Sequence, residues 1–267
     1  MKKFAKHAKL LLVSTFILVF LGISTIFVCV NGGEPVLYNL IIDIAANGEG
    51  GNNDHIMHFY GFGMRDNIGQ IQSDFKYWIA GSAADIDVYS PCDGTVVWLD
   101  PKFDGGEAEY QIMIRPKVKR GFGFGLSHYI VVLDHVADVK VSYGQKIKAG
   151  QAVGKPGGKD FFRNSPDGGR LVELSIDNAY NGMHYAPFMF FDPATKARYE
   201  AKIYKLMHDI EGRVGNMYNP AHIAANHDYT KMNIYGAGCT LDKIPEKYYL
   251  QKLDGYRTDR NDGYPLP

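Results

Sequence analysis

The stretch Val88-Tyr89-Ser90-Pro91-Cys92-Asp93-Gly94-Thr95-Val96 places a turn pair, Asp93-Gly94, between two runs of β-forming residues. A second stretch, Val141-Ser142-Tyr143-Gly144-Gln145-Lys146-Ile147-Lys148-Ala149-Gly150-Gln151-Ala152-Val153-Gly154, alternates single apolar residues with glycine turns. Both patterns favour short antiparallel strands joined by tight turns, in which glycine supplies the positive φ that other residues avoid. Together they predict a mainly β fold with an antiparallel sheet at its core.

Regions outside these two stretches predict further strands and one helix. We expect strands at residues 36–44, 95–99, 110–114, 129–133 and 171–176, with one or two more within 55–80. The C-terminal third differs. Asp192-Pro193 is typical of a helix N-cap followed by proline at the first helical position. Apolar residues then recur at a spacing of three to four, which predicts a helix over 193–211 that packs on the sheet.

The composition fits a globular protein. The chain has 267 residues, of which 46% are hydrophobic and 22% are charged, and its formal net charge is zero. Proteins that bind nucleic acid through its phosphates normally carry a clear excess of positive charge. We therefore expect no nucleic-acid partner.

The N-terminus has the pattern of a membrane anchor. Residues 10–30 contain no charged side chain, and at 1.5 Å per residue they span about 30 Å of hydrocarbon. Four lysines precede them, at positions 2, 3, 6 and 9. An excess of positive charge beside a membrane segment favours a cytoplasmic location for that end of the chain. We expect a single-pass protein of the cell inner membrane with its C-terminal part in the periplasm. The alternative is a cleaved signal peptide and a secreted protein.

The cysteines leave two possibilities open. Cys29 lies within the apolar segment, so Cys92 and Cys239 are the two thiols outside it. In an oxidising compartment they could form a disulfide, or they could be two separate buried thiols. Two cysteines by themselves cannot complete a zinc site.

The two glycine-turn stretches, in this order, resemble the β-sheet core of the lysostaphin/LytM-type zinc metallopeptidases, which cut peptide crosslinks in bacterial cell walls. The resemblance covers about residues 75–193. It implies a LytM-like (duplicated hybrid motif) domain at 75–193. The residue patterns around this domain predict a cytoplasmic N-terminus at 1–9, an anchor or signal peptide at 10–30, a linker with N-terminal strands at 31–74, and a helical and irregular extension at 194–267. The resemblance also implies a zinc ion that is held by a His and an Asp four residues apart and by the second His of a His-x-His strand.

Most of that ligand set has no counterpart in this sequence. Residues 74–81, where the His-x-x-x-Asp element belongs, contain no histidine, and the nearest upstream candidate is His58. The strand 170–176 places Leu171 and Glu173 at the two positions of His-x-His, and Glu173 could bind a metal through oxygen. The family's upstream catalytic histidine corresponds to His135, nine residues before Gly144.

Three functional hypotheses follow. The first is a membrane-anchored pseudo-peptidase outside the cytoplasm that needs no cofactor and binds peptidoglycan or an envelope protein. The second is an active zinc-dependent peptidoglycan endopeptidase in which His58 and Glu173 bind the metal and His135 is catalytic. The third is a hybrid-motif adaptor, or a carrier domain modified on lysine. Lys146 and Lys148 lack the Met-Lys-Met-like or Asp-Lys-Ala-like turn of such carriers, which disfavours the carrier.

Overall fold

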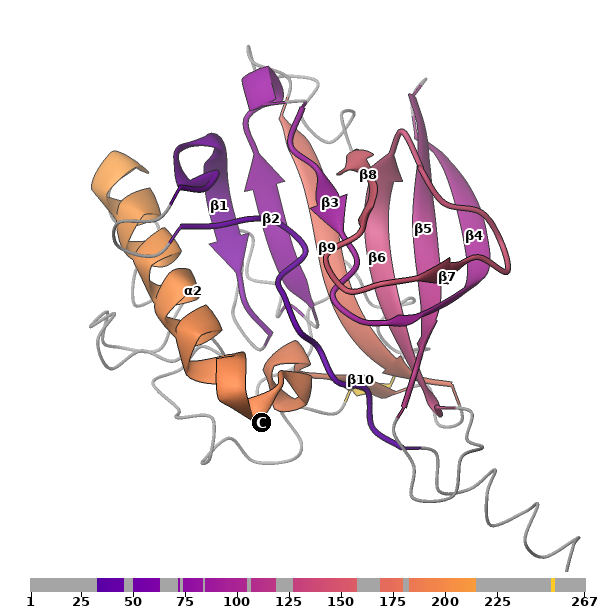
Figure 1. Cartoon of the computed structure of the whole chain (residues 1–267). Coiled ribbons are helices and arrows are strands. Elements are labelled where there is room, and N and C mark those ends of the chain that lie inside the picture. Colours follow the sequence, from indigo (N-terminus) through magenta and orange to yellow (C-terminus); the bar gives the residue numbers. More distant parts are fainter. Residues whose placement is uncertain are drawn as a thin grey trace, which may run out of the picture.

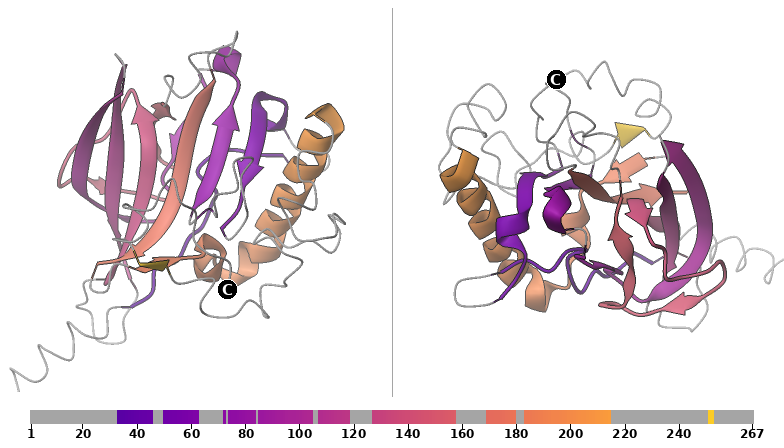
Figure 2. Two further views of the ribbon diagram at one scale, coloured as in Figure 1. Left: turned by 180° about the vertical axis from the view of Figure 1, so that it is seen from behind. Right: turned by 90° about the horizontal axis from the view of Figure 1, so that it is seen from above.

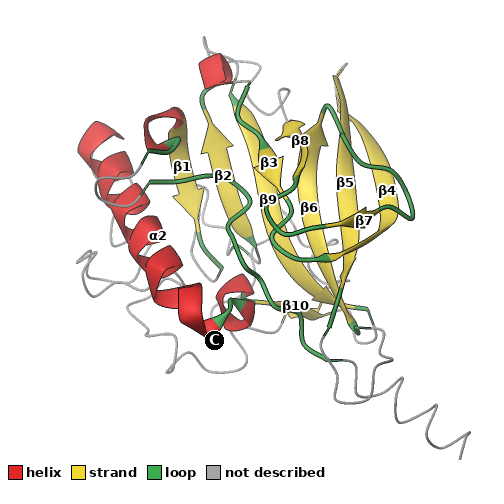
Figure 3. Cartoon of the chain, viewed as in Figure 1, coloured by secondary structure: helices red, strands yellow, loops and turns green. Residues whose placement is uncertain are grey.

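The computed structural model of the chain describes residues 33–45, 50–62, 72, 74–83, 85–104, 107–118, 127–157, 169–179, 183–214 and 251–252. Strands are the main regular elements of this part of the chain, and one long helix, α2 (Pro193–Val214), accompanies them (Figures 1 and 3). The predicted mainly β fold is confirmed. The predicted membrane segment, residues 10–30, lies outside the described residues. Within the described part, no helix is long and apolar enough to cross a membrane.

The main sheet is antiparallel throughout its central path, which runs β1-β2-β9-β6-β5-β4-β7. Its strands are β1 (Ile56–Tyr60), β2 (Phe75–Ile79), β9 (Arg170–Asn178), β6 (Tyr129–Ala137), β5 (Glu107–Pro116), β4 (Gly94–Asp104) and β7 (Lys146–Ile147). Four more strands lie off this path: β3 (Val88–Tyr89), β8 (Ala152–Pro156), β10 (Met183–Tyr185) and β11 (Gln251–Lys252). Short 3-10 turns are η1 (Asn53–His55), η2 (Gly81–Ala83) and η4 (Pro187–Phe190). Figure 2 shows the sheet curving strongly on the side of β4 and β5.

The two stretches that predict the fold pair with each other. They run antiparallel, with register partners Val88 and Gly154 in β3 and β8, and Thr95 and Lys146 in β4 and β7. Two of the glycines have left-handed backbones, Gly144 with φ of 79° and Gly150 with φ of 76°. Glycine is therefore needed at these corners for its conformation, as the sequence predicts.

Gly154 is needed for a different reason, which is space. A Cβ atom there would lie 2.4 Å from Val136 Cγ1 and 2.6 Å from the Ala137 carbonyl oxygen. We expect Gly154→Ala to lower the free energy of unfolding by about 1–3 kcal/mol in chemical denaturation, because the backbone must shift to relieve the clash. Gly50→Ala is the matched control, since a Cβ at Gly50 meets nothing within 4 Å. Equal effects of the two substitutions would contradict this account.

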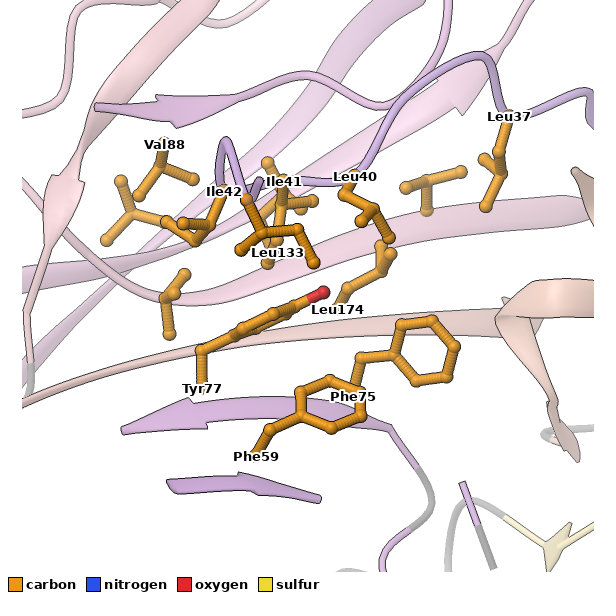
Figure 4. Close-up of a cluster of buried hydrophobic side chains, with 14 of the residues drawn as sticks. Leu37, Leu40, Ile41, Ile42, Phe59, Phe75, Tyr77, Val88, Leu133 and Leu174 are labelled. Carbon is orange, nitrogen blue, oxygen red and sulfur yellow. The ribbon is translucent and has the colours of Figure 1, made fainter. Parts of the chain in front are cut away.

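The apolar core lies between one face of the sheet and residues 37–44. Figure 4 shows Leu40, Ile41 and Ile42 lying over side chains of the sheet. The sequence predicts a strand at 36–44, and this prediction is wrong: within that range the structure has only an isolated bridge between Leu37 and Phe191. All three consecutive side chains are buried. A strand would point alternate side chains to opposite faces, so an irregular path is required to bury them together.

Helix α2 lies beside β1 at the edge of the sheet (Figure 1). The predicted helix is confirmed, and it ends at Val214. Asp192 caps it, because its Oδ1 accepts a hydrogen bond of 2.9 Å from the Ala194 amide. Its apolar stripe is buried and consists of Ile203, Leu206, Met207 and Ile210. Arg213 joins the helix to the sheet by donating to the Ile56 carbonyl at 2.6 Å.

Candidate functional site

The face of the sheet opposite the apolar core carries charged side chains. Lys76 in β2, Glu173 in β9 and Asp134 in β6 are register partners across three adjacent strands. Partners in register share a face, while their sequence neighbours point to the other side. Glu109 in β5 and Lys102 in β4 are register partners as well. These five residues and His135 form what we call the carboxylate–lysine cluster.

Three members of this cluster meet closely enough to be compared with a metal site. Asp134, His135 and Glu173 each offer one ligand atom, and the three atoms lie within 4.8 Å of one another. All three residues are buried, with exposed fractions of 6%, 2% and 4%. No other His, Cys, Asp or Glu residues among those described form such a group of three.

His135 owes its orientation to an unusual backbone. Its φ is 57°, in the left-handed region that few non-glycine residues adopt. The strand changes partner at this residue: Asp134 pairs with β9, and Val136 pairs with β8. The His135 ring Nδ1 lies 2.9 Å from Glu109 Oε1, and its carbonyl accepts a hydrogen bond of 2.7 Å from the Gly157 amide. The change of partner thus brings the histidine next to Glu109.

Lysine ammonium groups form ion pairs with the two carboxylates of the trio. Lys76 Nζ lies 2.8 Å from Glu173 Oε1. Lys102 Nζ donates to both oxygens of Asp134, at 2.7 Å from Oδ1. Gln111 adds a further hydrogen bond of 2.9 Å to Asp134 Oδ2. The acidic oxygens that a cation would need are therefore bound to positive groups of the protein itself.

The charges of the cluster balance when His135 is protonated. Three carboxylates (Glu109, Asp134 and Glu173) face three bases (Lys76, Lys102 and His135). Burial lowers the pKa of His135, but the hydrogen bond to Glu109 and the nearby charges of Glu173 and Asp134 outweigh it, so that the pKa is raised overall. A zinc ion would add two charges and would have to displace both ammonium groups. The residues as they stand do not fit a bound zinc ion.

The raised pKa of His135 predicts a pH dependence of stability. A base whose pKa is higher in the folded state stabilises the fold fully below its unfolded pKa of about 6.5. This stabilisation is lost as the pH rises through the folded-state pKa. We expect the free energy of unfolding to fall over that window, as measured by chemical denaturation at a series of pH values.

The matched variants are His135→Gln and His208→Gln. The first removes the titrating group, so its stability should change less with pH over the same window. His208 is exposed on α2 and lies outside the cluster, so its variant should keep the wild-type profile. A profile that His135→Gln leaves unchanged would assign the pH dependence to another group.

The structure brings together two of the three predicted site residues. His135 and Glu173 lie in the cluster, whereas His58 lies on β1 and is not part of the trio. The His58 ring packs edge-on against Trp78, with 5.9 Å between ring centroids, and burial lowers its pKa. β2 separates its strand from β9. Among the described residues, His58 is therefore not grouped with Glu173 and His135, and its role as a ligand stays a prediction.

Sequence reasoning missed Asp134, Lys76 and Lys102. Asp134 directly precedes His135, and neighbours along a regular strand point to opposite faces, so the pair would not be expected to share a site. The left-handed conformation of His135 breaks this alternation. The two lysines had no distinguishing signal, because a lysine on a strand usually marks a solvated face.

Cys92 is a buried thiol in the bend that precedes β4, with 1% exposure, and it forms no disulfide with another described residue. Burial, with a smaller contribution from Asp93, raises its pKa to about 12, which suppresses the reactive thiolate. Cys239 lies outside the described residues, as do His222 and His227. A disulfide between Cys92 and Cys239 therefore stays a prediction.

Solved structures that resemble this chain in fold include peptidases. One is a zinc-containing peptidase from Vibrio cholerae, at 15% identity and a TM-score of 0.35, covering 55% of this chain and 38% of that one. Another is the catalytic domain of lysostaphin from Staphylococcus simulans, at 17% identity and a TM-score of 0.31. That match covers 51% of this chain and 88% of the lysostaphin domain. The chain is similar in fold to LytM-type peptidases.

A third similar structure is the SpoIIQ–SpoIIIAH pore-forming complex, at 18% identity and a TM-score of 0.32, covering 61% of this chain and 91% of that one. No protein-family model and no curated protein sequence matches the chain. The chain spans 38% of the length of the Vibrio cholerae peptidase. Similarity at these levels concerns the fold and assigns no role to any residue.

Proposed function

We propose that this protein is a non-catalytic LytM-like domain that lies outside the cytoplasm and binds peptidoglycan or an envelope protein. Residues 10–30 would hold it in the inner membrane. The observation that carries the proposal is the pairing of Lys76 and Lys102 with the carboxylates of Glu173 and Asp134. Zinc hydrolases need deprotonated ligands around the metal and an open position for water. In this cluster two ammonium groups supply the positive charge instead.

The cluster is better explained as a structural element. It connects β2, β9, β6, β5 and β4 on one face of the sheet through ion pairs and hydrogen bonds. Buried ionic groups of this kind are tolerated when each charge is compensated. A binding protein keeps its scaffold in this way without the hydrolytic centre.

An exposed aromatic residue supports a binding role. Trp98 lies on β4, in the same alternation as Lys102 and therefore on the face of the cluster, and 54% of its surface is exposed. Exposed aromatic rings provide rigid, amphipathic contact surfaces for ligands and partner proteins. Purified peptidoglycan sacculi should retain the wild-type chain and retain Trp98→Ala less. Tyr143→Ala, at another exposed aromatic residue, is the matched control.

A measurement of zinc binding tests the proposal that the domain is non-catalytic. The full chain, equilibrated with zinc and separated from free metal, should carry no stoichiometric zinc because the cluster is already neutralised. Tight zinc at one ion per chain would contradict the proposal. Muropeptide hydrolysis that a chelator abolishes, and that Glu173→Ala also abolishes, would favour the active endopeptidase instead.

A further inference from the structure

A pocket of about 320 Å³ opens where β4, β5 and β7 meet, and it shares no residue with the carboxylate–lysine cluster. Its walls include four cationic side chains, Arg115, Lys117, Lys146 and Lys148, and one carboxylate, Asp93. Such a concentration is notable in a chain whose formal net charge is zero. Pockets of a few hundred Å³ are of the size that holds small ligands.

The single carboxylate of the pocket is already engaged. Asp93 Oδ1 accepts a hydrogen bond of 3.0 Å from the Ala149 amide, and Asp93 Oδ2 lies 3.0 Å from Lys148 Nζ. The Ala149 amide and the Lys148 ammonium lower the pKa of Asp93. Its negative charge is thus largely balanced by one lysine. Arg115, Lys117 and Lys146 remain as three positive charges with no counter-charge from the pocket lining.

The strand register places two of these cations around a hydroxyl group. Thr95 in β4 faces Arg115 in β5 on one side and Lys146 in β7 on the other. Adjacent strands are about 4.8 Å apart, so the two cations lie on the same face about 10 Å apart at their backbones. Long side chains from these positions can converge on one anion above Thr95.

Arg115 carries a donor without an acceptor. Its Nε is buried, and within the described part of the chain it has no hydrogen-bond partner. A buried donor that belongs to a charged group is costly to leave unsatisfied, so such a group in a pocket points to a missing ligand. The planar guanidinium matches phosphate oxygens, and lysine ammonium groups and hydroxyls add further donors.

We propose that this pocket binds a phosphate group. Arg115 would donate through its guanidinium, Lys146 would contribute charge, and the Thr95 hydroxyl would add a hydrogen bond. Gly94 would form the floor, because a Cβ there would lie 2.6 Å from the Arg115 carbonyl oxygen and the two strands could not approach so closely. The ligand class is a phosphate monoester or diester.

The position of the pocket indicates a source for the phosphate. Ser127 lines the pocket, and its Oγ lies 3.1 Å from the carbonyl oxygen of Gly33. Gly33 lies three positions after Val30, the end of the predicted anchor, which limits the distance between these two residues to about 11 Å. The headgroup of a phospholipid would then be within reach. This location rests on the anchor in the proposed function, whereas phosphate binding itself does not.

The test uses the full chain in alkyl maltoside micelles, which contain no phosphate. One arm titrates glycerol phosphate and the other dopes the micelles with phosphatidylglycerol, with glycerol and diacylglycerol as the controls that lack phosphate. Ligand that binds the folded state raises the thermal midpoint of unfolding in a saturable way. A response to glycerol phosphate alone assigns a soluble ligand, and a response to phosphatidylglycerol alone assigns a lipid headgroup.

The variants are Arg115→Gln and Lys146→Gln, with Lys196→Gln on α2 as a control outside the pocket. We expect Arg115→Gln to weaken the apparent affinity roughly tenfold to a hundredfold, Lys146→Gln to weaken it in the same direction, and Lys196→Gln to leave it unchanged. No saturable response in either arm, or equal responses in all three variants, would overturn the proposal. Because the pocket and the cluster share no residue, stoichiometric zinc would refute the proposed function and leave this result intact.

Discussion

Lys76→Met is expected to lower the free energy of unfolding by about 3 kcal/mol, measured by chemical denaturation. The substitution removes the ammonium that lies 2.8 Å from Glu173 Oε1, where the exposed fractions of the two side chains are 14% and 5%. A buried carboxylate that loses its neutralising partner keeps its desolvation cost and repels Asp134 and Glu109 nearby. The loss should therefore exceed that of any pair on the surface.

A double-mutant cycle separates this electrostatic cost from lost packing. Lys76→Met combined with Glu173→Met removes both charges and should recover much of the stability, because an apolar pair can replace a buried ion pair at little cost. Lys140→Met is the surface control: Lys140 pairs with Asp87, is 44% exposed, and should cost less than about 1 kcal/mol. Additive effects of the two cluster substitutions would show that the charges do not interact.

Phe75→Ala is expected to lower the free energy of unfolding by about 3–5 kcal/mol, again measured by denaturation. Phe75 has no exposed surface, and its ring packs against Phe59 at 5.6 Å and Phe188 at 5.2 Å between centroids. Truncation leaves a cavity among β1, β2 and η4, and the rigid sheet cannot collapse to fill it.

Tyr143→Ala provides the matched control for the core. Tyr143 is 74% exposed next to the corner glycine Gly144, and we expect its substitution to change stability by less than about 0.5 kcal/mol. A small effect of Phe75→Ala would mean that this aromatic group is not the centre of the core. The packing of residues 37–44 against the sheet would then have to account for most of the stability.

The same strands thus present two different faces. Tyr77, Leu133 and Leu174 point to the core (Figure 4), while their neighbours Lys76, Asp134 and Glu173 form the cluster on the other side. The ammonium groups of Lys76 and Lys102 pair with two of these carboxylates, which explains how a set of carboxylates can persist buried on this face.

Local sequence signals determined much of the architecture. The corners at Gly144 and Gly150 depend on the left-handed backbones of single residues, so they can be recognised along the chain. Gly94 has no such conformation and begins β4, where a Cβ would lie 2.6 Å from the Arg115 carbonyl oxygen. Helix α2 could be predicted because its cap and its apolar spacing are both local. The family resemblance that these signals carry also points to His135 and Glu173, which lie on the adjacent strands β6 and β9.

Only the tertiary structure decided the composition of the site. Which residues face Glu173 depends on the register between β2, β9 and β6, and that register joins segments nearly a hundred residues apart in the chain. The φ of 57° at His135 then brings Asp134 and its neighbour into one cluster against the usual alternation of a strand. Long-range pairing and one strained backbone position leave no local pattern, so Lys76, Lys102 and Asp134 emerged only from the fold.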